Sequence, residues 1–408
     1  VASARSGRPG AFRAARTGRL LCDVLPRAHG RETIGRSGTV CGTLSGMEPD
    51  WSALCAGAAS GRREICDDLL TGLLSVSGAE EDAALRALAD APPRLWPLLD
   101  ARFRTLWDPP EPASTGVLGR VLGSMSRDGR VRQRAVSALA PALAGGHGQV
   151  AASALALRTV DWVRPVRQEA RAALLAGPLP PGTTAAAVRL LIRLEGRARS
   201  EGVLQAFRDL LADPRRRGEA RRLAADTDPA TRRFGAALLL DLGDYTPAGL
   251  ERNALRDPDQ VCRLRYAQRL VDLDPDRAGS LLRARSAAVR EIAVAALPED
   301  ISAVSLTPAL ADRSRLVRAQ ARWKLYQRGE SPAGAYRNAL RRCGPASPAK
   351  LVAGLAAGLG ECGDASDVPM LTRLASREPP AWEDPDQVKG PVWPTPVRRA
   401  AVRALGRL

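Results

Sequence analysis

One spacing of apolar residues recurs along most of this 408-residue chain: a branched residue, a small residue four positions later, and leucine four positions after that. Residues four apart on an α-helix lie above one another on the same face, so three of them fit an apolar stripe roughly 100° wide. Each copy predicts an amphipathic helix with one buried face, and the small middle residue lets a neighbouring helix approach closely. The clearest copies are Val131/Ala135/Leu139, Val166/Ala170/Leu174, Val289/Ala293/Leu297, Val317/Ala321/Leu325 and Val397/Ala401/Leu405.

The copies return at intervals that fit a helix, a turn and a second helix. A single helix pair of this kind cannot bury its apolar face alone, so successive pairs are expected to stack and share one elongated core. We therefore predict an all-α fold, an α-solenoid of about nine stacked antiparallel helix pairs. The lead positions are Val131, Val166, Val203, Thr231, Cys262, Val289, Val317, Leu351 and Val397.

Three regions differ in character. Residues 1–46 contain eight arginines against Asp23 and Glu32 and show no sustained helical period. This stretch is expected to be a disordered basic leader, or a segment that is not translated because the chain starts at Met47. Residues 47–112 follow the helical pattern irregularly, as an end unit of a repeat array does, and residues 113–408 carry the regular copies.

A proline-rich insertion interrupts the last interval of the array, at residues 377–394. Proline at that density is incompatible with helix, so the segment is expected to form a loop. Two interpretations stay open, a spacer between helices and a binding loop that uses Trp382 and Trp393.

Composition narrows the classes of function. Apolar residues make up 45% of the chain and aromatic residues 4%, which favours helix over strand. The seven cysteines include no CxxC pair and no nearby histidine, so neither a zinc site nor any other metal or cofactor site is expected. Free thiols and the lack of an apolar run of about 20 residues predict a cytoplasmic protein without a membrane span.

The copy from Asp128 to Ala135 fits the pattern Asp-x-x-Val-Arg-x-x-Ala, and related segments stand at residues 359–364 and 404–408. Together they resemble bacterial HEAT-repeat proteins over about residues 113–408. The resemblance implies a right-handed solenoid in which recurring Asp and Arg side chains form a hydrogen-bonded ladder between repeats. Arginine suits this role because its guanidinium pairs with carboxylates through two hydrogen bonds. Here the ladder would comprise Asp128, Arg132, Asp161, Arg167, Arg290, Arg318 and Arg398, with Arg232 and Arg263 where Thr231 and Cys262 replace the valine.

Catalysis needs positioned titratable groups, and the chain has only two histidines, His29 and His147. His147 lies in a Gly-Gly-His-Gly turn and is expected to be an exposed loop residue. The resemblance extends to HEAT-like DNA glycosylases that act on alkylated bases. Such enzymes combine aromatic walls, a carboxylate and a basic groove, and Trp107-Asp108 and Asp161-Trp162 supply those residue types.

The densest basic run is a second candidate contact. Its arginines are expected either to form a solvent-facing helix surface or to bind an anionic partner such as nucleic acid or an acidic protein. The run comprises Arg215, Arg216, Arg217, Arg221, Arg222 and Arg233.

These observations lead to two hypotheses. The first is a non-catalytic scaffold that presents the concave face of the solenoid to an unidentified partner protein. The alternative is a nucleic-acid-binding solenoid, with or without glycosylase activity. A continuous positive groove with a tryptophan and a carboxylate at its floor would favour the alternative, and a face of mixed charge would favour the scaffold.

Overall fold

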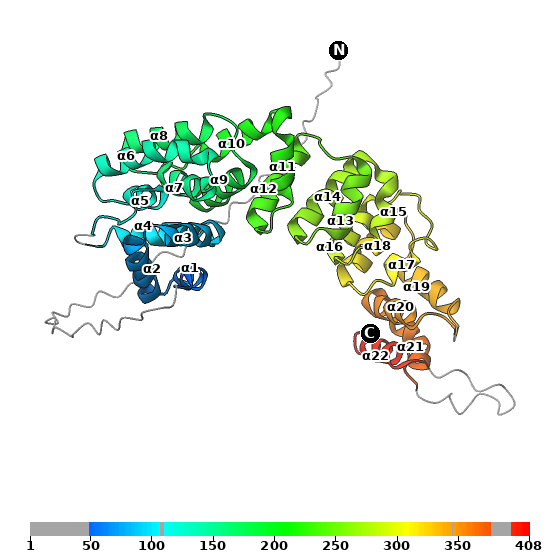
Figure 1. Cartoon of the computed structure of the whole chain (residues 1–408). Helices are drawn as coiled ribbons and strands as arrows, with labels where there is room; N and C mark the ends of the chain where they lie inside the picture. The colour runs from blue at the N-terminus through cyan, green and yellow to red at the C-terminus, as the bar shows by residue number, and fades with distance from the viewer. Residues whose placement is uncertain (1–48, 107–109, 345, 377–392) are drawn as a thin grey trace, which may run out of the picture. The chain divides into compact units, whose positions relative to one another are not determined.

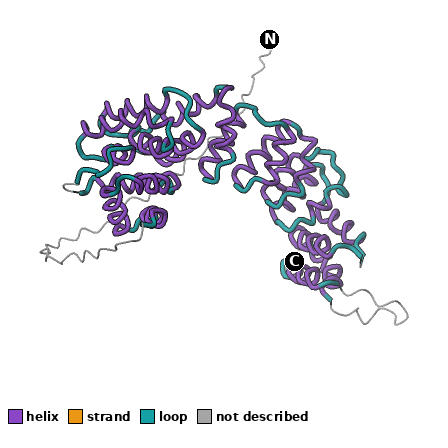
Figure 2. The backbone as a smooth tube through the Cα atoms, in the orientation of Figure 1, coloured by secondary structure: helices purple, strands orange, loops and turns teal. Residues whose placement is uncertain are grey.

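The computed structural model describes residues 49–106, 110–344, 346–376 and 393–408. Over these residues the chain is all-α, and Asp50–Leu408 form one unit of helices joined by turns (Figure 1). No strand occurs in the described ranges (Figure 2). The basic leader expected at residues 1–46 and most of the insertion expected at 377–394 lie outside them.

Twenty-two α-helices and four short 3₁₀ helices lie in the described residues. The first eleven α-helices are α1 (Trp51–Ala59), α2 (Arg63–Ser75), α3 (Ala79–Asp90), α4 (Leu95–Phe103), α5 (Val117–Gly123), α6 (Gly129–Leu139), α7 (Gly148–Arg158), α8 (Arg164–Leu175), α9 (Pro181–Leu194), α10 (Val203–Ala212) and α11 (Arg217–Ala224). The second eleven are α12 (Pro229–Asp241), α13 (Pro247–Arg256), α14 (Gln260–Leu273), α15 (Ala278–Leu281), α16 (Ala287–Ala296), α17 (Thr307–Leu310), α18 (Arg315–Gln327), α19 (Pro332–Arg341), α20 (Ala349–Cys362), α21 (Val368–Ala375) and α22 (Thr395–Leu405). The 3₁₀ helices are η1 (Ala140–Ala144), η2 (Pro214–Arg216), η3 (Pro275–Arg277) and η4 (Ala365–Asp367).

The four-residue register lies on the buried side of its helices. Val166, Val289, Val317 and Val397 are each at most 1% exposed. Val131 is half-buried, although the leucine eight positions after it in α6 is fully buried. The apolar stripe read from the sequence is therefore the face through which these helices pack.

Consecutive helices pack against each other and against the next pair. The helix α13 packs on α14, α15 on α16, α17 on α18 and α19 on α20, while α14, α16 and α18 pack in series. A set of second helices thus forms one side of the stack, and this arrangement positions the surfaces described below.

The small middle position permits close approach of helix backbones, and Gly235 in α12 shows why. A Cβ atom added to Gly235 would overlap the backbone of Ala224 at the end of α11. A larger residue at this register position would force the two helices apart.

Aspartates start several helices, since a carboxylate can accept from backbone amides that have no partner in the first turn. Asp228 accepts from the Thr231 amide at 2.9 Å and begins α12. The next Asp-Pro sequence is Asp257-Pro258, but the cap of α14 is Asp259, which accepts from the Cys262 amide at 3.0 Å. Asp257 accepts from the amide of Asp259.

The buried apolar side chains form two clusters that meet at α12. The first runs from Trp51 to Leu239, and the second runs from Ala236 to Ala404. The irregular helices α1–α4 share the first cluster with the helices that follow them. Packing is therefore continuous from the end unit into the repeats, and α12 contributes to both clusters.

Within the described residues, every helix is too short or too polar to cross a lipid bilayer.

Candidate functional site

The register arginine of α6, Arg132, is fully buried and makes two kinds of contact. One guanidinium nitrogen donates to the carbonyl oxygens of Ser126 and Arg127 in the turn before α6, each at 2.9 Å. The other two nitrogens donate to the two carboxylate oxygens of Asp161, each at 3.0 Å. A single side chain thus closes its own turn and joins α6 to the turn between α7 and α8, the two helices of the next pair.

The same geometry recurs in the second half of the chain. Arg290 donates to two carbonyl oxygens of the preceding turn at 2.7 and 3.1 Å, and to the carboxylate of Asp312 at 2.7 and 2.8 Å. Arg318 donates to the carbonyl oxygen of Asp312 at 2.6 Å, but its carboxylate partner is Glu361 of α20. An arginine at this register position therefore binds the next repeat wherever a carboxylate stands opposite it.

Arg232 lies 3.7 Å from a carboxylate oxygen of Asp257 in the next repeat, whereas the remaining members of the expected ladder do not form ion pairs of this kind. Asp128 accepts from a backbone amide at 2.8 Å and caps its own helix, α6. Arg167 donates to the carbonyl oxygen of Asp161 at 2.6 Å, and Arg398 donates to the Thr395 hydroxyl at 3.2 Å. In the described ranges no carboxylate lies within ion-pair distance of Arg167 or Arg398. The ladder is thus interrupted in this chain.

Asp161 is the centre of the largest buried ion-pair network. Besides Arg132, it accepts from Arg158 and from the Val163 amide, both at 2.9 Å. Burial alone raises the pKa of the Asp161 carboxyl, but these hydrogen bonds and the arginine charges outweigh it and hold the pKa below its usual value. Trp162 is 63% exposed, and its ring lies 5.4 Å from the guanidinium carbon of Arg132. The carboxylate of Asp161-Trp162 is therefore already occupied and turned away from any ligand, and Trp107-Asp108 lies outside the described residues.

The basic run of the sequence occupies η2, the first and last turns of α11 and part of α12. Two of its members are paired: Arg221 donates to Asp244 at 2.8 and 3.0 Å, and Arg233 donates to Asp259 at 2.8 Å. The run therefore presents less free positive charge than its sequence suggests. No carboxylate of the described residues lies within ion-pair distance of Arg215, Arg216, Arg217 and Arg222.

The remaining candidate residues from the sequence are the two tryptophans of the insertion and His147. Trp393 is half-buried and packs against the second core cluster, whereas Trp382 falls outside the described residues. The Nε2 atom of His147 lies 2.9 Å from a carboxylate oxygen of Asp82. Within the described ranges, no group of three or more His, Cys, Asp or Glu side chains is placed to hold a metal ion.

Sequence reasoning missed a depression of the surface that runs across several helices. Three hollows of about 650, 680 and 620 Å³ adjoin the helices α12, α14 and α16, and the first of them is lined largely by α9, α10 and the loop between them. The first and second hollows share Ala237 and Arg265, and the second and third share Gln268 and Asp272. They therefore form one continuous track from the loop between α9 and α10 across α12, α14 and α16 to α18, which we call the second-helix groove.

The floor of the second-helix groove is formed by small and apolar side chains. Phe234 and Ala237 line it on α12, and Ile292 and Ala295 line it on α16. These positions lie beside the buried register, one step around each helix, and Ala295 is exposed. A ligand in the groove would therefore cover apolar surface that the fold leaves open.

The rim of the groove carries both signs of charge. Arg265 and Arg269 line it on α14, Asp272 follows them one turn later, and Glu291 lines it on α16. No opposite charge among the described residues lies within ion-pair distance of Arg265, Arg269 or Glu291. The second-helix groove is thus of mixed charge, and tryptophan is not among the residues that line these hollows.

The fold and the groove define the class: an all-α chain of stacked helices with an open groove along one side of the stack. No protein-family model and no curated protein matches the chain. Among solved structures, the chain matches a crystal structure described as an engineered protein, at 18% sequence identity, over 88% of this chain and 93% of that chain, with a TM-score of 0.21. A TM-score this low supports no inference about fold or function.

Proposed function

We propose that this chain is a non-catalytic protein-binding scaffold, a right-handed α-solenoid of about nine HEAT-like helix pairs that holds a segment of a partner protein in the second-helix groove. The observation that carries the proposal is the continuity of the groove across α12, α14, α16 and α18. A track that crosses successive helices suits an extended or helical polypeptide segment better than a compact small molecule, which fits a single enclosed pocket.

The chemistry of the groove supports a polypeptide ligand. Its floor offers apolar area, which supplies most of the free energy of association when it is buried. Its rim offers Arg265 and Arg269 as cations and Glu291 as an anion, so charges on a partner can fix the direction in which the segment lies. A groove built only for phosphates would need no unpaired carboxylate on its rim.

The proposal is tested by selecting peptide ligands from a displayed random library against the full chain and measuring their affinity for two variants. Ala295→Arg fills the floor of the groove at an exposed position and should lower affinity by at least tenfold. Ala56→Arg places the same side chain at an exposed position of α1, outside the groove, and should leave affinity unchanged.

Hydrogen exchange on the same complexes locates the ligand independently. Bound peptide should slow exchange in α14 and α16 and leave α1 and α2 unchanged. Selected peptides that bind both variants equally and protect other helices would overturn the groove as the binding site. A selection that yields no ligand for the folded chain would overturn the scaffold function.

A further inference from the structure

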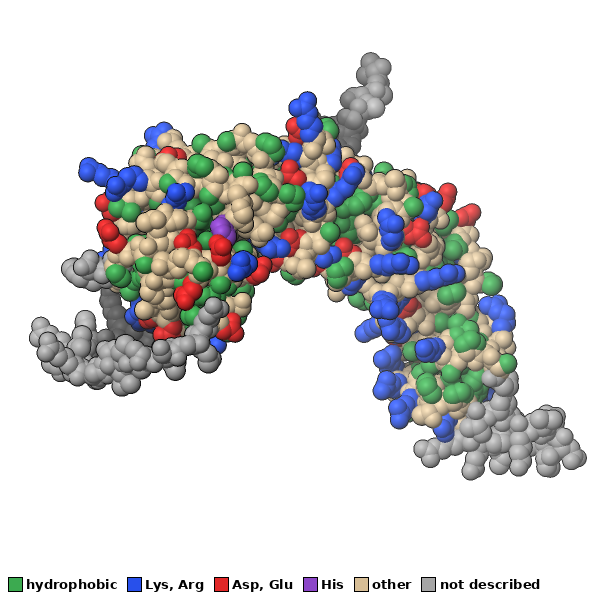
Figure 3. Space-filling model, viewed as in Figure 1, with side chains coloured by type: hydrophobic (Ala, Val, Ile, Leu, Met, Phe, Trp, Pro, Cys, Tyr) green, Lys and Arg blue, Asp and Glu red, His purple; other side chains and the backbone are tan. Residues whose placement is uncertain are grey.

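Seven positively charged side chains gather at three turns of the C-terminal half. Each turn joins the first helix of a pair to the second, and all seven side chains are exposed. Figure 3 shows Lys and Arg side chains gathered over the C-terminal helices, with few acidic side chains among them on this face. The seven are Arg283 and Arg285 between α15 and α16, Arg313 and Arg315 at the start of α18, and Arg341, Arg342 and Lys350 between α19 and α20. We call this set the basic edge.

Contacts between the turns show that they are neighbours. Arg313 donates to the carbonyl oxygen of Arg285 at 3.1 Å, which joins the first two turns. The Tyr336 hydroxyl of α19 donates to the carbonyl oxygen of Leu310 at 3.1 Å, and Arg341 follows Tyr336 by five residues on the same helix. The middle of α19 therefore lies beside the end of α17, where the turn into α18 begins.

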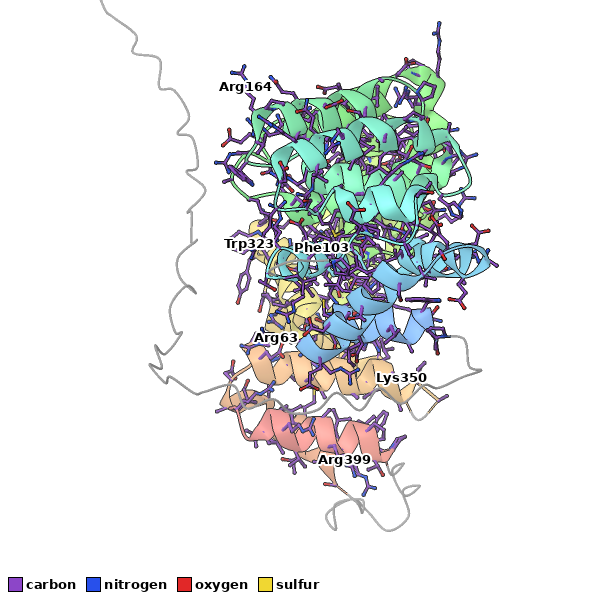
Figure 4. The ribbon with its side chains drawn as sticks, turned by 60° about the vertical axis from the view of Figure 1, so that its left-hand side comes forward. Arg63, Phe103, Arg164, Trp323, Lys350 and Arg399 are labelled. Atoms are coloured by element: carbon purple, nitrogen blue, oxygen red, sulfur yellow. The ribbon has the colours of Figure 1, made fainter. Side chains whose placement is uncertain are left out.

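The first turn of α20 completes the edge. Gly354 packs directly on the backbone of Ala311, just before the α18 turn, and Lys350 stands one helical turn earlier in α20. Figure 4 labels Lys350 near one end of its helix and Trp323 of α18 toward the opposite side of that view. Trp323 is thus separate from the part of the basic edge that Lys350 forms.

Positive charge at the edge is not offset by nearby acids. Between residues 313 and 350 the chain has ten Lys and Arg residues, and Glu330 is the only acidic residue. The carboxylate of Asp312, which precedes this stretch, is held by Arg290 and by the Ser314 amide at 2.7 Å. Elsewhere in the described residues, no carboxylate lies within ion-pair distance of any member of the basic edge.

We propose that the basic edge binds the phosphate backbone of double-stranded nucleic acid without reading its base sequence. Neighbouring helices pack about 8–10 Å apart, so each turn places its cations about one such step from the next. A duplex carries one negative charge per ~1.7 Å of its axis, and phosphates therefore meet these cations in any register. The guanidinium fork suits phosphate oxygens through paired hydrogen bonds.

Two features of the basic edge favour a duplex over an acidic protein segment or a single strand of nucleic acid. The edge is polar except for Leu316, and one exposed apolar side chain does not make the cluster of apolar anchors that a protein interface normally uses. Trp323 and Tyr326 stand on α18 at least ~12 Å along the helix axis from Arg315, too far to stack bases held at the edge. Phosphate contacts alone position a duplex and carry no sequence information.

The test measures binding of the full chain to a fluorescent 20-base-pair duplex from 50 to 300 mM salt. If four to seven phosphates are neutralised, the slope of log K against log salt should be about −4 to −6. The variant Arg285→Gln/Arg313→Gln/Arg342→Gln should reduce the magnitude of that slope by about 2 to 3 and weaken binding at least 20-fold at 100 mM salt.

The matched control Arg215→Gln/Arg216→Gln/Arg222→Gln removes the same charge from η2 and α11 and should change affinity less than threefold. Equal losses in both triple variants would mean that net charge alone drives binding and would overturn the edge. The proposal would also be overturned by no binding at 50 mM salt, by a strong preference among duplex sequences, or by a poly-glutamate peptide that binds more tightly than the duplex. None of these outcomes depends on the second-helix groove.

Discussion

Replacing Asp161 with asparagine tests the buried ion pairs that join successive repeats. The carboxylate and the Arg132 side chain are both fully buried, and asparagine would keep the shape of the site but remove its negative charge. Arg158 would keep Asp100, which lies 2.5 Å away, whereas Arg132 would keep no carboxylate, only two backbone carbonyl groups and the amide oxygen of the new side chain. One guanidinium would then be buried without an opposite charge, which costs about 3–5 kcal/mol.

Because each repeat contacts only its neighbours, this loss should be local. A cost of about 3–5 kcal/mol corresponds to roughly a hundredfold to several-thousandfold increase in the equilibrium for local opening, at 1.4 kcal/mol per factor of ten. Native-state hydrogen exchange measures that equilibrium directly. Amides of α6, α7 and α8 should exchange faster by this factor, and amides of α20–α22 should exchange as in the wild type.

The double variant Arg132→Met/Asp161→Asn distinguishes a lost ion pair from a damaged fold. It removes the buried positive charge too, so part of the protection should return, because replacing a buried pair with an apolar side chain is often nearly neutral. Asp244→Asn breaks the exposed pair with Arg221 and should leave exchange unchanged. Wild-type exchange in Asp161→Asn, or a double variant whose loss equals the sum of both single losses, would refute the coupling between Arg132 and Asp161.

Three further predictions concern the packing and the acid sensitivity of the C-terminal repeats. Val317→Asp should destabilise by at least ~3 kcal/mol and lower the melting temperature, because Val317 is 1% exposed, whereas Leu316→Asp at a 62% exposed position should not. Gly354→Ala would force a Cβ atom into the backbone of the adjoining repeat, so urea denaturation should show a free energy of unfolding lower by about 1–3 kcal/mol. Gly218→Ala adds a Cβ atom that meets no atom within 4 Å and should raise the free energy of unfolding by about 0.5–1 kcal/mol. Burial raises the pKa of the Glu361 carboxyl, but hydrogen bonds from two arginines outweigh burial and hold the pKa below its usual value of 4.5. The ionised carboxylate therefore stabilises the fold above pH 4.5, and this stabilisation is lost as pH falls through the lowered pKa. Denaturation midpoints between pH 7 and 3 should thus fall less steeply for Glu361→Gln than for the wild type, and equal slopes would contradict this assignment.

The helices could be predicted from the sequence because their signal is local. The four-residue register depends on residues within one helix, and Val166, Val289, Val317 and Val397 all lie where that register places them. The small residue at Gly235 has a similarly simple cause, because the backbone of one neighbouring helix leaves no room for a side chain there.

Pairing between repeats depends on how far each helix is shifted along its neighbour, which the local pattern does not encode. Gly354 rather than the first turn of α20 lies against Ala311, so the end of α20 reaches Arg318 and supplies Glu361 as its partner. An alignment by register alone puts Leu351 opposite Val317 and provides no carboxylate at that place. The shift of α20 is a property of packing, and only the structure reveals it.

Both proposed binding surfaces escaped sequence reasoning for a related reason. The second-helix groove is formed by positions beside the register on separate helices, none of which is unusual in its own segment. The contiguous arginines at 215–217 are conspicuous in the sequence, whereas Arg285, Arg313 and Arg342 come from three different turns. A charged surface built from one residue per repeat becomes visible only when the turns are placed side by side.

The same structure explains why net charge is a poor guide to binding in this fold. A turn leaves carbonyl groups without helical partners, and Arg132, Arg263, Arg290 and Arg318 each donate to carbonyl oxygens five or six residues earlier. Arginine at the register position is therefore consumed by the fold, and its charge contributes little to the surface. Among the described residues, the exposed cations without an ion-pair partner stand off the register, in turns such as those of the basic edge and on helix faces, as Arg265 does on α14. It follows that replacing turn arginines with glutamine should weaken anion binding with little change in stability. Replacing register arginines should lower stability with little change in anion binding.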